Sequence, residues 1–178
     1  GVSQFVLADG SLSINPSSLD RKITKENAQP KATGGWSNIV TYKNFTLDFL
    51  LRGVTGNYIL NTTRADLNYP AEVTRYNLSK EAINEPVNNT RANYTSTRYL
   101  EKGDYIRLDN ITLSYTPKIS SPFLKKLTVY TTVNNAFVLT KYKGIDPEID
   151  MGGLNPGIDD RNFYPKTRSF IFGVRVDF

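Results

Sequence analysis

Five carboxylates lie close together in the last third of the chain, and their residue type could do chemistry: Asp146, Glu148, Asp150, Asp159 and Asp160. Hard cations such as Ca²⁺ take several oxygen ligands of this kind, but the spacing fits no EF-hand loop. Two carboxylates also suffice for glycoside hydrolysis, although nothing in the sequence sets the separation that this reaction requires. We therefore interpret these residues as solvated loop carboxylates, with Asp146-Pro147 beginning a turn, and predict that the chain is not an enzyme.

Two residue types that commonly carry catalysis or hold metals are absent. The sequence contains no His and no Cys, which removes the commonest general base, thiolate metal sites and cysteine nucleophiles together. We predict no cofactor and no metal; calcium in the acidic loop is conceivable but has no support. The formal net charge of +5 comes from 22 basic and 17 acidic residues. These charges form no basic stripe along the chain, so we predict no nucleic-acid partner.

Several tyrosines lie in or beside the long stretch from Val54 to Asp104: Tyr58, Tyr69, Tyr76, Tyr94 and Tyr99. Aromatic faces next to Asn, Arg and Thr side chains suit the binding of a sugar or a peptide. The same residues could instead pack the loop against itself or against a partner protein. The sequence leaves both interpretations open.

Alternation of apolar and polar residues predicts five strands. No run of 18 apolar residues occurs, so we predict no membrane-spanning helix. The strands cover residues 35–42, 45–53, 105–115, 127–137 and 168–178. In the third strand the apolar phase slips near Asp109-Asn110, which indicates a β-bulge. One apolar face is predicted to contact lipid: Phe45, Leu47, Phe49, Leu51, Leu127, Val129, Val133, Phe170, Phe172, Val174 and Val176. Trp36 and Tyr42 lie about 20 Å apart along their strand, near the expected positions of two aromatic girdles.

The connections between these strands alternate between long and short. Residues 8–34, 54–104 and 139–167 form long connections, whereas Lys43-Asn44 and the proline-containing stretch 116–124 are short. Long loops count against a compact soluble domain, but an outer-membrane barrel has short periplasmic turns and long extracellular loops. The sequence thus predicts an all-β chain of antiparallel strands from a transmembrane up-and-down barrel. A soluble all-β binding module with two sheets is the alternative.

Four stretches of the sequence resemble one known family: QPKATGGWSNIVTYKNFTLDFLLRG, YLEKGDYIRLDNITLSYTPK, LKKLTVYTTVNNAFVLTKYKGIDPEID and the ending YPKTRSFIFGVRVDF. They are similar to the C-terminal barrel end of the SusC/RagA family of TonB-dependent outer-membrane transporters. The most specific pieces are Gly103 to Leu108, Thr140 to Gly144 with Asp146 to Glu148, and Tyr164-Pro165. The resemblance covers most of residues 29–178.

The resemblance implies a barrel of 22 strands with a plug in its lumen, in the outer membrane of a Gram-negative bacterium. It implies uptake of oligosaccharides or peptides with energy from TonB, together with a SusD-like surface lipoprotein. Residues 1–178 would then be a C-terminal segment of the barrel domain, without the plug and the remaining strands. It also implies that the last strand carries the signal read by the barrel-insertion machinery: Phe170, Phe172, Val174, Val176 and the terminal Phe178.

Overall fold

The computed structural model describes residues 4–85, 96–149, 156–160 and 164–178, which form two compact units. The first, here called the sheet unit, comprises Lys31–Thr55, Asp104–Lys141 and Tyr164–Phe178. The second, the loop unit, comprises Gly1–Pro30, Gly56–Gly103 and Tyr142–Phe163. The loop unit is therefore built from the long connections that the sequence predicted.

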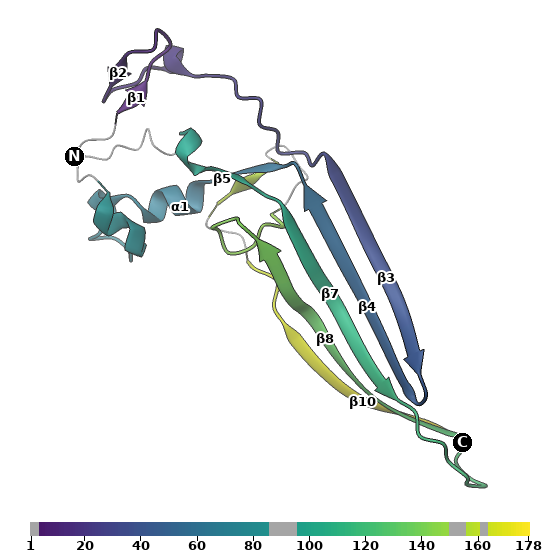
Figure 1. The fold of residues 1–178 in the computed structure, drawn as a ribbon. Coiled ribbons are helices and arrows are strands. Elements are labelled where there is room, and N and C mark those ends of the chain that lie inside the picture. The colour runs from purple at the N-terminus through teal and green to yellow at the C-terminus, as the bar shows by residue number, and fades with distance from the viewer. Residues whose placement is uncertain (1–3, 86–95, 150–155, 161–163) are drawn as a thin grey trace. The chain divides into compact units, whose positions relative to one another are not determined.

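The sheet unit is one antiparallel sheet of five strands (Figure 1). Its strands are β3 (Ala32–Tyr42), β4 (Phe45–Thr55), β7 (Tyr105–Tyr115), β8 (Lys126–Thr140) and β10 (Ser169–Asp177). They lie side by side in the order β10-β8-β7-β4-β3, so each strand pairs with its neighbours in the sequence. This up-and-down arrangement confirms the predicted fold, and the bounds of β7 agree with the sequence residue by residue.

The strand ends explain the alternation of long and short connections. At one end of the sheet, here called the short-turn end, Tyr42 pairs with Phe45 and Phe45 with Tyr115. The turn after Tyr42 has only two residues, and Lys43 takes the positive φ of 54° that such tight hairpins require. At the opposite end Ala32 pairs with Thr55, so the long connections all join the sheet there.

The predicted bulge is present, and it is part of a larger stagger across three strands. Two successive residue pairs on one face are Phe49 with Ile111 and Leu51 with Leu108. Between these two pairs, β7 contains one more residue than β4. On β8 the corresponding partners are Val133 and Phe137, which adds a further residue. The extra residue of β7 is Asp109. Because bulges bend strands and increase twist, this stagger curves the sheet locally.

The loop unit holds short elements rather than unstructured chain. A small sheet joins β6 (Leu100–Lys102), β5 (Tyr58–Asn61) and β9 (Ile158–Asp159), with β5 and β9 parallel. A helix α1 (Thr62–Leu67) follows β5, and 3₁₀ helices cover Ser18–Asp20, Pro70–Glu72, Lys80–Asn84 and Thr97–Tyr99. Strands β1 (Phe5–Val6) and β2 (Leu12–Ser13) form a separate hairpin. Ile59, Tyr142 and Ile149 form the buried apolar cluster of the loop unit. Across the described residues, none of the helices has the length and apolar character needed to cross a membrane.

Candidate functional site

One side of the large sheet, here called the apolar face, carries no charged residue among the five described strands. Residues paired across antiparallel strands point to the same side, so the register assembles this face strand by strand. It consists of Trp36, Asn38, Val40 and Tyr42 from β3; Phe45, Leu47, Phe49 and Leu51 from β4; Ile106, Leu108, Ile111, Leu113 and Tyr115 from β7; Leu127, Val129, Thr131, Val133, Phe137 and Leu139 from β8; and Phe170, Phe172, Val174 and Val176 from β10. Every strand residue that the sequence predicted to face lipid lies here.

The bulge on β7 is what makes this face continuous. In the sequence, Ile106 and Leu108 are out of phase with Ile111 and Leu113. The extra residue Asp109 returns both to the side occupied by Leu51 and Ile111. Side chains alternate between the two sides along a strand. Without the extra residue, Ile106 and Leu108 would therefore point to the opposite side of the sheet.

Much of the apolar face is exposed. Phe172 is 79% and Phe170 63% exposed, and Trp36, Tyr42, Phe45, Val129 and Val174 are also exposed, whereas Leu47, Phe49, Leu51, Leu127 and Val133 are half-buried by their neighbours. Soluble proteins rarely leave a contiguous apolar surface of this kind in water. Contact of this face with lipid stays a prediction, and this exposure is what supports it.

The dimensions of the apolar face suit a membrane. On β4 the face runs from Phe45 to Gly53, which pairs with Ile106, and eight residue steps cover about 26 Å. With the usual strand tilt of about 40°, the height along the membrane normal is about 20 Å, close to the apolar band of about 25 Å in outer-membrane barrels. Tyr42 lies at one end of this band, and Trp36, whose ring packs edge-on against Phe49 at 5.3 Å between centroids, lies toward the other.

The opposite side of the sheet, here called the polar face, is held by polar contacts. The Arg52 guanidinium forms a two-point ion pair with the bulged Asp109, with 2.9 Å between Nη2 and Oδ1. Arg107 donates to the Asn135 side chain at the bulge of β8, where Asn135 has a φ of 50°. Thr112 and Thr132 hydroxyls lie 2.7 Å apart across the strands. This face suits a water-filled lumen.

Gly173 leaves room for a large side chain on the polar face. It pairs with Tyr130 across the last hairpin, and a Cβ added at Gly173 would lie 2.3 Å from the Tyr130 ring. A glycine is therefore needed for this close approach, and the pair joins the final strand to β8 by a specific contact.

The predicted tyrosine sites do not behave alike. Tyr58, Tyr69 and Tyr76 are half-buried and keep part of their surface available. Tyr99 is 0% exposed, and the Arg64 and Arg98 guanidinium carbons lie 5.4 and 5.7 Å from its ring centroid. At Tyr99 the structure therefore supports the packing interpretation and not a ligand contact. Tyr94 lies outside the described residues.

The acidic residues are not uniformly solvated, which corrects the interpretation made from the sequence. Asp159 is buried and accepts hydrogen bonds from the Tyr142 hydroxyl and, at 3.0 Å, from the Thr63 hydroxyl. Asp146 is also buried, and its Oδ1 accepts from the Glu148 amide at 2.9 Å. Burial, reinforced by the bond to Asp159, raises the pKa of the Tyr142 phenol well above its usual value.

These contacts organise the loop and provide no obvious ligand set. Asp160 is exposed, while Asp150 lies outside the described residues. The described part of the chain contains no group of three or more Asp, Glu, His or Cys residues that could hold a metal ion.

The loop unit also contains an ion-pair network that the sequence did not reveal, which joins α1 to the Lys80–Asn84 3₁₀ helix and to β6. Arg64 on α1 contacts Glu81 at 2.8 Å and Glu101 at 3.0 Å, and the Asn68 amide donates to Glu81 at 3.1 Å. Hydrogen bonds from Asn68 and Arg64 hold the pKa of Glu81 below its usual value. The sequence feature that could have predicted the start of α1, and so the position of Arg64, is Asn61. Its side chain caps α1 by accepting a hydrogen bond from the Arg64 amide at 2.8 Å.

A pocket of about 240 Å³ opens beside this network, between α1, the Lys80–Asn84 3₁₀ helix and residues 143–145. Leu67 and Ile145 contribute apolar surface, and Lys80 and Lys143 contribute positive charge. Arg64 and Glu81 both line the pocket, so their ion pair shapes its wall.

The comparisons with known proteins agree on one family. No family model matches the sequence. The TonB-dependent receptor SusC of Bacteroides thetaiotaomicron is 30% identical over 196 residues, covering 99% of this chain and 18% of that protein. The TonB-dependent receptor P3 of Formosa agariphila is 29% identical, with 100% and 19% coverage.

Solved structures give the same result for the fold. The RagAB peptide importer in its closed-closed state matches with a TM-score of 0.76 and 25% identity, over 99% of this chain and 21% of that one. Its open-open state gives a TM-score of 0.79 at 23% identity, with 100% and 21% coverage. The chain spans about a fifth of the length of the proteins it matches. It is therefore part of a SusC/RagA-like TonB-dependent receptor, and its five antiparallel strands are a section of the wall of an outer-membrane β-barrel.

Proposed function

We propose that the full-length protein imports a nutrient, an oligosaccharide or a peptide, across the bacterial outer membrane. The carrying observation is the separation of the sheet into a charge-free, exposed apolar face and a polar face rich in ion pairs and hydroxyl contacts. Such a sheet suits a wall between lipid and a water-filled lumen. The similar proteins named as TonB-dependent receptors and as a peptide importer support the direction and energy source of this transport.

In this proposal residues 1–178 supply a C-terminal segment of the barrel domain. The apolar face contacts lipid, the short turns lie in the periplasm, and the loop unit lies outside the cell. Strand β10 and the residue after it present Phe170, Phe172, Val174, Val176 and Phe178 to the insertion machinery. The five strands leave two open edges, at β3 and β10, and these edges pair with other strands of the same protein, since an open edge in lipid would leave backbone groups without hydrogen bonds.

The partners follow from the same proposal. TonB acts through regions of the protein outside this chain, and a SusD-like lipoprotein covers the extracellular mouth. Tyr58, Tyr69 and Tyr76, together with Tyr94, are the proposed contacts with cargo or with that lipoprotein. The proposal assigns no catalytic step to the chain, in keeping with relatives that are named as receptors.

The alternative of a soluble binding module accounts less well for the apolar face. In a β-sandwich those residues would be covered by a second sheet, whereas Phe170, Phe172 and Val174 are exposed. The test is fractionation of cells that produce the full-length protein, followed by detergent extraction and electrophoresis with and without heating. A heat-shifted band from the outer-membrane fraction supports the transporter. A soluble product whose migration ignores heating refutes it.

A further inference from the structure

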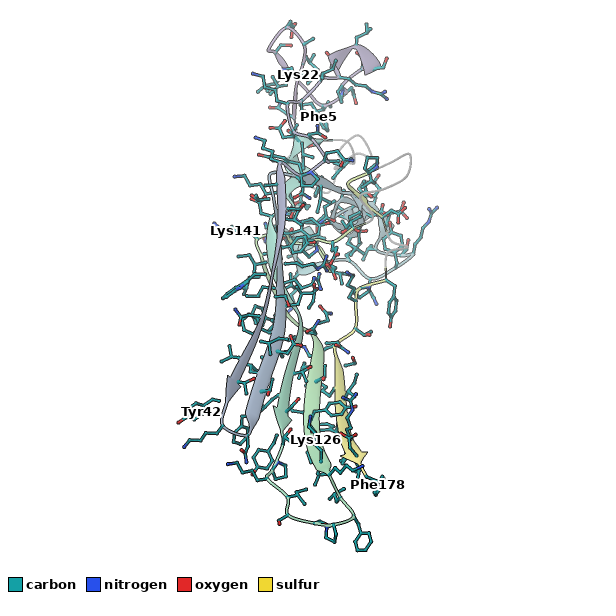
Figure 2. The ribbon with its side chains drawn as sticks, turned by 90° about the vertical axis from the view of Figure 1, so that its right-hand side faces the viewer. Phe5, Lys22, Tyr42, Lys126, Lys141 and Phe178 are labelled. Atoms are coloured by element: carbon teal, nitrogen blue, oxygen red, sulfur yellow. The ribbon has the colours of Figure 1, made fainter. Side chains whose placement is uncertain are left out.

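The short-turn end of the sheet forms a continuous rim. It consists of Tyr42–Asn44, residues 116–126 and Asp177-Phe178. Backbone hydrogen bonds join its parts: the Thr116 amide donates to the Asn44 carbonyl at 2.8 Å, and the Lys125 amide donates to the Asp177 carbonyl at 2.9 Å. Figure 2 shows Tyr42, Lys126 and Phe178 at this end of the sheet, with Lys141 toward the other.

The rim combines positive charge with exposed aromatic rings. Its charged residues are four exposed lysines, Lys43, Lys118, Lys125 and Lys126, and a single acid, Asp177, which pairs in register with Lys126. In the described part of the chain no carboxylate lies within ion-pair distance of these lysines. Three aromatic side chains accompany them: Tyr42 is 68%, Phe123 82% and Phe178 80% exposed.

The position of the rim lysines relative to the apolar face indicates what kind of molecule they bind. The apolar face carries no charge and ends at Tyr42, Phe45 and Tyr115, and the lysines follow directly beyond that boundary. At a membrane this boundary is the depth of the headgroups, where aromatic rings anchor and long lysine side chains extend toward phosphate. Toward the opposite end of the sheet unit lie Lys31, Asp104, Lys141, Lys166 and Arg168, so basic residues flank the apolar face at both ends.

We propose that this rim binds the headgroups of anionic phospholipids in the adjoining leaflet. This inference rests on the proposed membrane location of the sheet. The occupant is a lipid and not an acidic protein because the lysines lie beside exposed aromatic rings and are continuous with the apolar face. An isolated basic patch for a protein would need neither feature. Lys43 illustrates the arrangement: its ammonium lies 5.2 Å from the centroid of the Tyr42 ring, so charge and ring reach the same depth.

The test uses the full-length transporter, purified in detergent, stripped of lipid and titrated with phosphatidylglycerol or phosphatidylcholine while bound lipid is counted by native mass spectrometry. The variant replaces Lys43, Lys118 and Lys125 by Ser. Each lysine near an anionic surface contributes on the order of a fivefold preference, so three together give roughly 100-fold at low salt. The preference of the wild-type protein for phosphatidylglycerol should therefore largely disappear in this variant, while phosphatidylcholine binding stays unchanged.

Two controls sharpen the result. Replacing the exposed Lys31, Lys141 and Lys166 by Ser removes the same charge from the sheet unit outside the rim and should leave the preference intact. Replacing Lys43, Lys118 and Lys125 by Arg instead keeps the charge and should also preserve the preference, which guards against a folding defect. The inference is overturned if the wild-type protein has no preference for the anionic lipid, or if the rim and control Ser variants behave alike. A protein with no heat-shifted band in the outer-membrane fraction would instead refute the proposed function itself.

Discussion

An arginine placed on either side of β4 should reveal which face meets lipid. Leu47 and Leu50 are the same residue type, three positions apart, and both are half-buried. Leu47 lies on the apolar face between Val40 and Leu113. Leu50 lies on the polar face, paired with Ser37 and Asn110. We expect Leu47→Arg to destabilise the barrel in its membrane far more than Leu50→Arg.

The magnitude follows from depth in the apolar band. The midpoint of the band on β4 is near Phe49, because the face runs from Phe45 to Gly53. Leu47 is two residues away, which after strand tilt corresponds to about 5 Å from the bilayer centre. Arginine on the lipid face costs about 2–4 kcal/mol at the centre and less toward the interfaces, so we expect about 2–3 kcal/mol here. That cost corresponds to a roughly 30- to 150-fold lower folding equilibrium constant. Leu50→Arg adds a cation next to Asp48 and Arg52 on the water-facing side and should cost under about 1 kcal/mol.

The assay is urea-dependent folding of the full-length protein into phospholipid vesicles, with the heat-shifted band as the measure of the folded fraction. Purified components avoid any effect of the cellular insertion machinery, and Leu47 lies outside the proposed assembly signal. Equal destabilisation by the two substitutions would refute the assignment of faces. Greater damage from Leu50→Arg would mean that the polar face, and not the apolar face, is the one removed from water.

Three further predictions test other contacts. Asp109→Asn should weaken the Arg52 ion pair on the polar face and lower barrel stability by about 1 kcal/mol, less at high salt; an unchanged urea midpoint would contradict this. Gly173→Ala should displace the Tyr130 ring and cost about 1 kcal/mol, whereas in a Tyr130→Ala background it should be neutral, and equal costs in both backgrounds would exclude the contact. Glu81 has a lowered pKa from Asn68 and Arg64, so its stabilisation of the loop unit is present above pH about 4.5 and is lost as pH falls through the lowered value. Hydrogen exchange in α1 should then speed up on acidification in the wild type but depend less on pH in Glu81→Gln, and identical pH profiles would refute the role of Glu81.

The sequence predicted the sheet well because each of its strands is long and one-sided. Period-two alternation over eight or more residues has few competing explanations, and the two-residue link at Lys43-Asn44 leaves only a hairpin. The bulge at Asp109 was visible because a single extra residue shifts the apolar phase. The bulge on β8 was not visible, since relative to β4 that strand carries two extra residues between Val133 and Phe137. Two extra residues restore the original phase, so the pattern continues as if nothing had been inserted.

The loop unit was harder to predict because its structure depends on distant residues. Strand β9 has two residues and exists only because Leu60 and Asn61 pair with Ile158 and Asp159, almost a hundred positions away. No periodicity can be read from such a short element. The burial of Asp159 has the same cause, since its partners Tyr142 and Thr63 come from separate segments. Composition alone suggested solvated carboxylates and could not show these contacts.

The two units are stabilised by different interactions, and this bears on how such a protein could change its cargo. The sheet unit depends on its strand ladders, the Arg52–Asp109 pair and threonine contacts. The loop unit depends on the contacts of Arg64 with Glu81 and Glu101 and on the buried Asp159. The contacts named for each unit join residues of that same unit. Substitutions that remodel the pocket beside α1 therefore leave the stabilising contacts of the sheet unit in place. Under the proposed function, a loop that binds a new ligand can then be selected without loss of insertion into the membrane, whereas we expect a charge placed on the apolar face to disrupt insertion whatever the loops bind.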